Sequence, residues 1–195
     1  GVIVHLGGQT PLKLALDLES EGIKIMGTSA DSIDIAEDRE RFKELMDELQ
    51  ILQPESRIAK NKNEVLKLSE EMEYPIVVRP SYVLGGRSME VVYSISDLES
   101  YLKEEVNISS KRPLLMDQFL KDAKEIDVDA LCDGEDVVIC GILEHIEEAG
   151  VHSGDSTMVL PPYSLSKVML DQIKEKTKQI ALKLKVKGLV NVQYA

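Results

Sequence analysis

The sequence predicts an α/β segment at the front of the chain, followed by a longer mixed α+β body. The first thirty residues run strand, helix, strand, an order that places two parallel strands beside a helix. The later residues alternate short apolar stretches with tight turns, which is typical of antiparallel strands. The chain has 195 residues, of which 43% are hydrophobic. A chain of this length buries roughly 70% of its unfolded surface on folding, so one compact unit or two small subdomains are expected.

The front segment, residues 1–30, is expected to form a βαβ unit. Residues 2–4 are apolar and predict a buried strand, and the helix that follows carries Pro11 in its first turn. Residues 23–26 return as the second strand. The stretch from Gly27 to Ala30 is the candidate boundary between this segment and the rest of the chain.

The body, residues 31–195, begins with helices. Phe42, Leu45, Met46 and Leu49 fall at the spacing of one apolar helix face. The strands predicted after them cover residues 58–59, 74–80, 89–93, 114–119, 125–131, 137–146, 157–159 and 189–194. Further helices are predicted near residues 65–72, 97–106 and 165–186. An Asp133-Gly134 pair predicts a hairpin turn between two of the strands.

Composition excludes several classes of protein. The net charge of -12 argues against nucleic acid as a partner, because neutralising phosphates requires clustered Lys and Arg. Apolar runs fall short of the roughly 18 residues that a membrane span requires, so no membrane partner is expected. Cys132 and Cys140 lack a C-x-x-C spacing and are expected to be buried or half-buried free thiols of a cytoplasmic protein. The start without Met predicts a fragment.

A glycine-bearing loop follows the strand of residues 74–80. Gly85 and Gly86 allow backbone N–H groups to approach an anion without obstruction by a Cβ atom. Arg79 lies near the end of the strand, where its guanidinium could contact two phosphate oxygens. An ordinary hairpin with solvated arginines explains the same residues equally well.

Two further polar stretches are candidates. Residues 144–156 concentrate acids, histidines and serines in one loop, but their spacing supports neither a zinc site nor a hydrolase nucleophile. Alternation places Glu125, Asp127 and Asp129 on one face of a strand. A solvated sheet face is the favoured interpretation of these acids, and a sugar or cation ligand at Glu125 is the alternative.

Taken together, these stretches resemble the ATP-grasp domain of carbamoyl phosphate synthetase large subunits. The most similar part is the second half, which phosphorylates carbamate. The strings that carry the resemblance are Tyr74 to Arg87, Glu125 to Asp129, Glu144 to Ser156, Gly7 to Pro11 and Glu37 to Phe42. The resemblance covers essentially the whole chain.

The resemblance implies a fold and a set of site residues. Residues 1–30 would be the tail of a preceding Rossmann-like domain, and residues 31–195 an ATP-grasp domain truncated at its C-terminus. Arg39 would be catalytic. The implied nucleotide-binding residues are Arg79, Gly85, Gly86, Gln118, Leu120, Glu125, Gly150, Val151, His152, Ser153 and Gln193. Gln193 would also contact Mg²⁺ or Mn²⁺. A K⁺ site would draw on Glu125, His145, Glu147, Val151 and Ser156.

The resemblance also implies partners and a pathway. In such enzymes a glutamine amidotransferase small subunit supplies ammonia, and the rest of the large subunit completes the reaction that feeds arginine and pyrimidine synthesis. Ser88 and Gln118 depart from the usual pattern, and the strand that carries the remaining metal ligands should follow shortly after Gln193. These 195 residues alone are therefore expected to bind nucleotide weakly and not to turn over. The alternatives are another ATP-grasp ligase, such as a biotin carboxylase relative, or a non-catalytic nucleotide-binding module.

Overall fold

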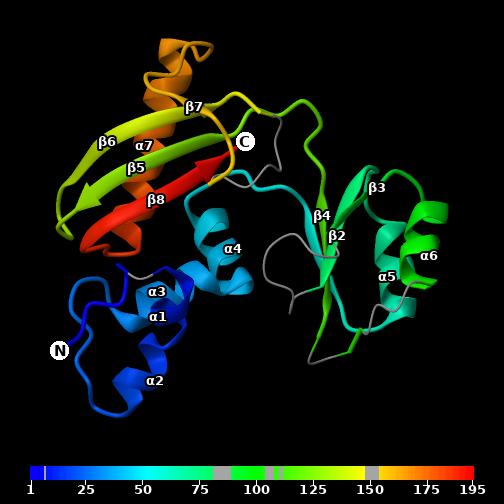
Figure 1. Cartoon of the computed structure of the whole chain (residues 1–195), viewed down its shortest axis with the longest axis horizontal. Coiled ribbons are helices and arrows are strands. Elements are labelled where there is room, and N and C mark those ends of the chain that lie inside the picture. Colours follow the sequence, from blue (N-terminus) through cyan, green and yellow to red (C-terminus); the bar gives the residue numbers. More distant parts are fainter. Residues whose placement is uncertain (7, 81–88, 104–107, 110–111, 148–153) are drawn as a thin grey trace. The chain divides into compact units, whose positions relative to one another are not determined.

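The computed structural model describes residues 1–6, 8–80, 89–103, 108–109, 112–147 and 154–195 (Figure 1). The chain forms two compact units. Unit 1 consists of Gly1–Leu52 and Asp122–Ala195, and unit 2 consists of Gln53–Lys121. Unit 2 is therefore an insertion within the sequence of unit 1.

Unit 1 is built on a four-stranded antiparallel sheet with the order β7-β6-β5-β8. Its strands are β5 Ile126–Cys132, β6 Val137–His145, β7 Met158–Val159 and β8 Gly188–Tyr194. The predicted turn at Asp133 joins β5 to β6, and the Asp133 Oδ1 atom accepts hydrogen bonds from the backbone N–H groups of Glu135 and Asp136. These bonds confirm the hairpin.

One face of this sheet is covered by α7, Lys167–Lys183 (Figure 1). The helix begins where the Ser166 hydroxyl accepts a hydrogen bond from the backbone of Met169. Ile173 on α7 packs with Ile126 and Val128 of β5. Apolar contact with α7 thus occupies one face of the sheet and leaves the other for polar side chains.

The described residues of the first part of unit 1 form four helices. They are α1 Gln9–Lys13, α2 Ala15–Ser20, α3 Ala30–Glu37 and α4 Arg39–Glu48. Leu45 and Met46 of α4 pack against Ile180 and Ala181 of α7. The apolar helix face predicted from the sequence is confirmed.

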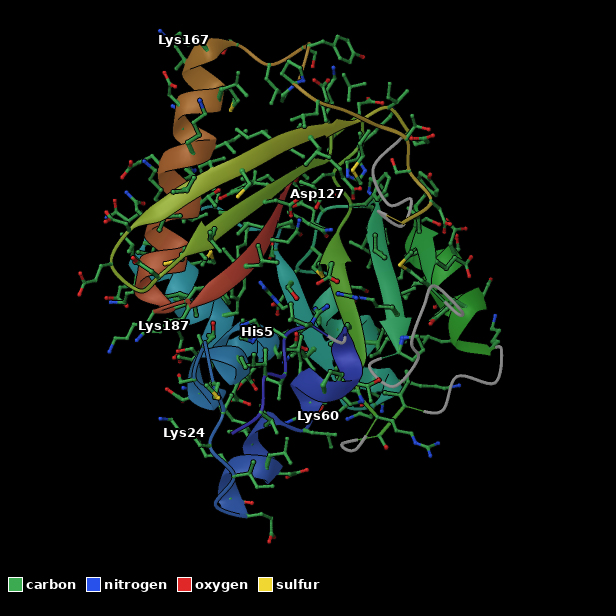
Figure 2. All side chains as sticks on the ribbon, turned by 60° about the vertical axis from the view of Figure 1, so that its left-hand side comes forward. His5, Lys24, Lys60, Asp127, Lys167 and Lys187 are labelled. Carbon is green, nitrogen blue, oxygen red and sulfur yellow. The ribbon has the colours of Figure 1, made fainter. Side chains whose placement is uncertain are left out.

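A close contact joins the front segment to the start of β8. The Thr28 hydroxyl accepts a hydrogen bond from the Lys187 N–H at 3.0 Å. The ring of His5, labelled with Lys187 in Figure 2, lies so near Gly27 that a Cβ atom there would be 2.4 Å from its Cε1 atom. Gly27 also has a φ of +97°, which a side chain would strain. The contact fixes the end of the strand that carries Gln193.

Unit 2 is a second antiparallel sheet, with the order β1-β4-β2-β3. Its elements are β1 Ser56–Ala59, α5 Lys62–Ser69, β2 Ile76–Pro80, β3 Glu90–Val92, α6 Ile95–Lys103 and β4 Leu114–Gln118. Figure 1 shows α5 and α6 side by side against this sheet. Val65 of α5 and Leu98 of α6 form one apolar core with Ile76 and Met116 of the sheet.

The βαβ unit at the front is shorter than its predicted strands and helix suggested. Among the described residues, the two predicted strands meet only as an isolated parallel bridge between Val2 and Ile25. Two backbone hydrogen bonds hold it, Val2 N–H to Lys24 O and Met26 N–H to Val2 O. The helix between the strands is interrupted at Leu14. The parallel direction is as predicted, but so short a pairing does not extend into a sheet.

The two cysteines differ in exposure. Cys132 is buried, as predicted, whereas Cys140 is exposed, so the prediction is wrong for Cys140. Asp129 pairs with Gly141 and Ala130 pairs with Ile139, which leaves Cys140 as the extra residue of a β-bulge. The bulge interrupts the alternation of inward and outward side chains at this point.

Candidate functional site

The face of the unit 1 sheet opposite α7 gathers the acids and amides of two strands. In the register of β5 and β8, Asp127 is paired with Gln193 and Asp129 with Asn191. The Asn191 Nδ2 group donates a hydrogen bond to Asp129 Oδ1 at 2.9 Å. Paired residues project from the same face of a sheet. Gln193, predicted as a nucleotide and metal contact, therefore lies on the same face as the acidic residues of β5.

Glu125, Asp127 and His145 form a cluster at the start of β5. His145 Nε2 lies 2.7 Å from Asp127 Oδ2, and His145 Nδ1 lies 3.4 Å from Glu125 Oε2. The backbone N–H of His145 donates to the Glu125 carbonyl at 3.0 Å. Asp127 and His145 are buried, while the Glu125 side chain is 29% exposed. The favoured expectation of a solvated acidic face is therefore wrong for Asp127, because His145 of β6 contacts its side chain and both residues are buried. Figure 2 labels Asp127 on the sheet.

Glu144 is a buried acid that no pattern in the sequence singles out. Its Oε2 atom accepts hydrogen bonds from the backbone of Tyr163 at 3.1 Å and of Ser164 at 3.0 Å. Its Oε1 atom accepts from the Ser164 hydroxyl and from Lys124 Nζ. Burial alone raises the pKa of Glu144, but the hydrogen bonds from Ser164 and Lys124 outweigh it and hold the pKa below its ordinary value. Glu144 therefore ties the loop before α7 to β6.

Glu147 and Ser156, two predicted K⁺ ligands, are in direct contact. Glu147 Oε2 accepts from the Ser156 hydroxyl at 2.9 Å and from the Thr157 backbone at 2.6 Å. The hydrogen bonds from Ser156 and Thr157 lower the pKa of Glu147. The described part of the chain contains no group of three or more His, Cys, Asp or Glu side chains placed to hold a metal ion. A cation here would need backbone and hydroxyl oxygens as well.

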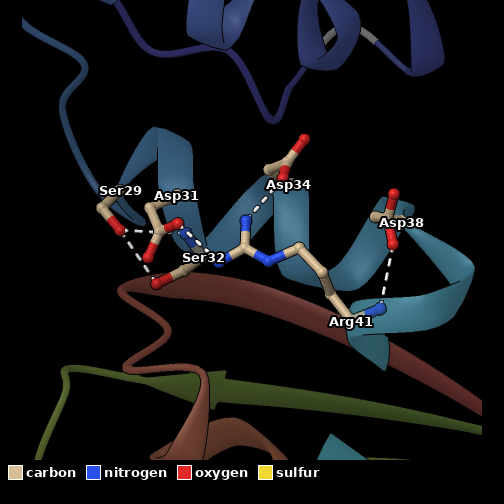
Figure 3. A network of polar contacts seen from close by, with 6 residues as sticks. All are labelled: Ser29, Asp31, Ser32, Asp34, Asp38 and Arg41. Carbon is tan, nitrogen blue, oxygen red and sulfur yellow. Dashed lines mark hydrogen bonds and ion pairs between the residues drawn. The ribbon is translucent and has the colours of Figure 1, made fainter. Parts of the chain in front are cut away.

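Arg39, the predicted catalytic residue, is the first residue of α4. Asp38 caps the helix by accepting a hydrogen bond from the Arg41 backbone at 2.9 Å. The Arg41 side chain then reaches back to α3 and contacts Asp34 at 2.5 Å and Asp31 at 2.7 Å (Figure 3). Hydrogen bonds to Asp31 and Asp34 raise the pKa of Arg41. This network links α3 to α4, the helix that begins with Arg39.

In unit 2, Arg79 lies on the face of β2 that does not contact α5 and α6. Its neighbours Val78 and Pro80 are buried, and the Arg79 side chain is 43% exposed. Its Nη2 and Nε atoms lie 3.3 Å from Asp117 Oδ2 on β4. A guanidinium has five N–H donors, more than the described contacts of Arg79 with Asp117 occupy.

Gln118 and Leu120 lie at the end of β4, where the chain leaves unit 2. The Gln118 N–H donates to the Glu55 carbonyl at 2.8 Å, and both Gln118 and Leu120 are half-buried. Six predicted site residues lie outside the described residues: Gly85, Gly86, Gly150, Val151, His152 and Ser153.

A cavity of about 890 Å³ lies within unit 1 beside β8. Asp129, Asn191 and Gln193 line it together with Phe42 of α4. Cys140 also lines it. The predicted metal and nucleotide contact Gln193 thus borders a space of the size that small-molecule sites occupy.

Separately, the described helices include none long and apolar enough to cross a membrane.

Two family models match the chain. The model described as carbamoyl-phosphate synthase L chain, ATP binding domain, matches residues 38–195, and the carbamoyl phosphate synthase preATP-grasp domain matches residues 1–35. The chain is 58% identical over 195 residues to the carbamoyl phosphate synthase large chain of Pasteurella multocida (strain Pm70). It is 57% identical to the large chain, C-terminal section, of Aquifex aeolicus (strain VF5). The match covers all of this chain but only 18% and 36% of these relatives.

Solved structures support the predicted fold. A biotin carboxylase complex from Campylobacter jejuni gives a TM-score of 0.72 at 17% identity, covering 93% of this chain and 42% of that one. An N5-carboxyaminoimidazole synthase from Aspergillus clavatus, in complex with ADP, gives 0.70 at 19% identity, covering 93% and 46%. At this level of identity the similarity establishes the fold alone. The prediction of an α/β front segment followed by an ATP-grasp fold is confirmed.

Proposed function

Because the chain belongs to the family of carbamoyl-phosphate synthase L chains, we propose that it binds ATP and, within a longer protein, phosphorylates carbamate to carbamoyl phosphate. The observation that carries the proposal is the open face of the unit 1 sheet. There Asp127 of β5 is paired with Gln193 of β8, which lines a cavity, and Glu125 immediately precedes β5. The product would feed arginine and pyrimidine synthesis in the cytoplasm.

The proposed chemistry requires positioning and charge neutralisation rather than a nucleophilic side chain. Phosphoryl transfer spreads negative charge over the transferring oxygens, and cationic side chains offset that charge. Arg39, at the start of α4, and Arg79, on the open face of β2, are proposed for this role. Gln118 and Leu120 are proposed for the adenine, and Glu125 for the ribose hydroxyls. The glycines and loop residues that lie outside the described residues remain part of the proposal.

Bound cations would supply further charge. Mg²⁺ or Mn²⁺ takes oxygen ligands, and the Gln193 amide on the acidic sheet face fits that preference. K⁺ is proposed beside Glu125, His145, Glu147, Val151 and Ser156. The contact between Glu147 and Ser156 supports the grouping of two of these ligands.

The proposal also includes a division of the chain and partners. Residues 1–30 are proposed as the tail of a Rossmann-like domain and residues 31–195 as the ATP-grasp domain, supported by family matches to residues 1–35 and 38–195. The partners are the rest of the large subunit and a glutamine amidotransferase small subunit. Relatives named as large chains support a multi-chain enzyme.

Titration of the enzyme with ATP tests the proposal. Arg79→Ala and Glu125→Ala are each expected to weaken ATP binding by about tenfold or more, because each removes a charged hydrogen-bonding partner. Arg57→Ala is the matched control, since Arg57 lies in the same sheet as Arg79 and pairs with Glu55. Unchanged ATP affinity in both variants would favour a non-catalytic contact module instead.

A further inference from the structure

Asp127 is a buried carboxylate to which the proposed function gives no role. Its side chain is 6% exposed, and burying a charged carboxylate costs several kcal/mol unless partners compensate. Oδ2 has His145 as its partner, whereas Oδ1 is buried with no hydrogen bond from the described residues. A half-satisfied buried acid in the interior of a strand calls for an explanation other than stability.

His145 connects this acid to Glu125. A carboxylate only accepts hydrogen bonds, so the imidazole donates its Nε2–H to Asp127. That bond sets the orientation of the ring, whose Nδ1 lies 3.4 Å from Glu125 Oε2 and has no hydrogen bond from the described residues. The His145 backbone N–H also holds the Glu125 carbonyl. A hydrogen bond from His145 thus restrains the Glu125 backbone, and the Glu125 carboxylate lies beside a ring that Asp127 orients.

We propose that Asp127 is a positioning residue for nucleotide binding, acting through His145 to hold the Glu125 carboxylate where ribose hydroxyls bind. The inference rests on the proposed function. Exposure separates the roles, because Glu125 is 29% exposed and can contact a ligand, whereas the side chains of Asp127 and His145 are 6% and 3% exposed. A side chain held in one orientation before binding loses less entropy when the ligand arrives.

The ratio of the dissociation constants for deoxy-ATP and ATP tests the inference in the full enzyme that contains this chain. The wild-type protein should prefer ATP to 2′-deoxy-ATP and 3′-deoxy-ATP. Asp127→Ala should reduce that preference several-fold, because Glu125 is no longer held. Asp127→Asn retains an acceptor for His145, so this variant should keep most of the wild-type preference for ATP.

A buried polar residue elsewhere in unit 1 is the control. Thr177 is fully buried and bonds to the Ile173 carbonyl and to Tyr194 Oη. Thr177→Val should lower stability and leave the preference unchanged. Where Asp127→Ala does not fold, His145→Gln gives the same test, since its amide can still face Asp127 but places no ring beside Glu125.

The background variant Glu125→Ala separates the possible failures. If it abolishes the preference for ATP, adding Asp127→Ala should change nothing more. Full preference in Asp127→Ala and His145→Gln, alongside its loss in Glu125→Ala, would overturn the inference and leave the proposed function intact. An unchanged preference in Glu125→Ala itself would overturn the inference together with the ribose role proposed for Glu125.

Discussion

Two polar networks in unit 1 use the same types of groups at opposite degrees of burial. Around Glu144, a carboxylate that is 1% exposed receives hydrogen bonds from Ser164, Tyr163 and Lys124. Around Arg41, a guanidinium that is 39% exposed contacts Asp31 and Asp34 on the neighbouring helix. The first lies between a sheet and the loop before α7, and the second lies at the surface between α3 and α4.

The difference shows that contact distances alone do not determine how much a network contributes to the free energy of unfolding. Arg41 has two partners at short distances, but water and salt screen exposed charges, so such pairs contribute little. The buried Glu144 carboxylate accepts hydrogen bonds from the protein instead of from water. Removing it would leave those donors buried and without an acceptor. Substitutions at the two sites should therefore differ in size and in their response to salt.

The largest effect is expected for Glu144→Ala. The substitution leaves the N–H groups of Tyr163 and Ser164 without their acceptor, and the free energy of unfolding should fall by about 3 kcal/mol. Urea unfolding followed by circular dichroism measures the change. A loss no larger than that of the surface substitutions would mean that burial does not distinguish the two networks.

A smaller, pH-dependent effect is expected for Glu144→Gln. The pKa of Glu144 lies below its reference value of 4.5 in the folded protein. Its charged form therefore adds stability that is present above pH 4.5 and is lost as the pH falls through the folded-state pKa. Unfolding measured between pH 3 and pH 7 should show the wild type more stable at neutral pH and the two proteins converging in acid. A constant difference across that range would contradict the sign.

A still smaller effect is expected for Arg41→Met. Loss of the contacts to Asp31 and Asp34 should lower the thermal midpoint by less than about 3 °C. The difference should shrink in 1 M salt, where the Debye length is about 3 Å. Calorimetry at low and high salt measures both. A difference independent of salt would show that packing of the arginine stem, rather than charge, joins α3 to α4.

The smallest effect is expected for Lys43→Met, which serves as the matched control for Arg41. Lys43 lies on the same helix and pairs with Asp47 one turn further along, and both side chains are more than 60% exposed. Its thermal midpoint should stay within about 1 °C of the wild type. A fall in the thermal midpoint as large as that of Arg41→Met would mean that an ion pair between two helices stabilises the protein no more than one within a single helix.

Local pattern predicted much of this fold, because it depends on neighbours in sequence. The apolar face of α4, the turn at Asp133 and the strand that carries Arg79 all follow from spacing within a few residues. The alternation predicted Glu125, Asp127 and Asp129 on one face. The register with β8 agrees for Asp127 and Asp129, whereas Glu125 precedes β5 and lies outside that register.

What the sequence could not supply depends on pairing between distant residues. Asp127 is buried because it contacts His145, which lies eighteen positions further along the chain. No sequence pattern around Asp127 predicts this contact. Glu144 and Glu147 stand three residues apart in one polar string, yet only the register of β6 places Glu144 in the interior. The bulge at Cys140 likewise arises from the pairing of β5 with β6.

The insertion of unit 2 within unit 1 has a consequence for biosynthesis. β1 and β4 pair near the two ends of unit 2, so its sheet is complete once residue 118 has been made. The apolar side of α4, with Leu45 and Met46, is buried only after Ile180 and Ala181 of α7 have been synthesised. Because synthesis proceeds at roughly 5–20 residues per second, that surface stays uncovered for many seconds after it leaves the ribosome. Unit 2 is therefore expected to fold first on the nascent chain. Chaperones are expected to bind mainly to unit 1, whose apolar surface is exposed for longer.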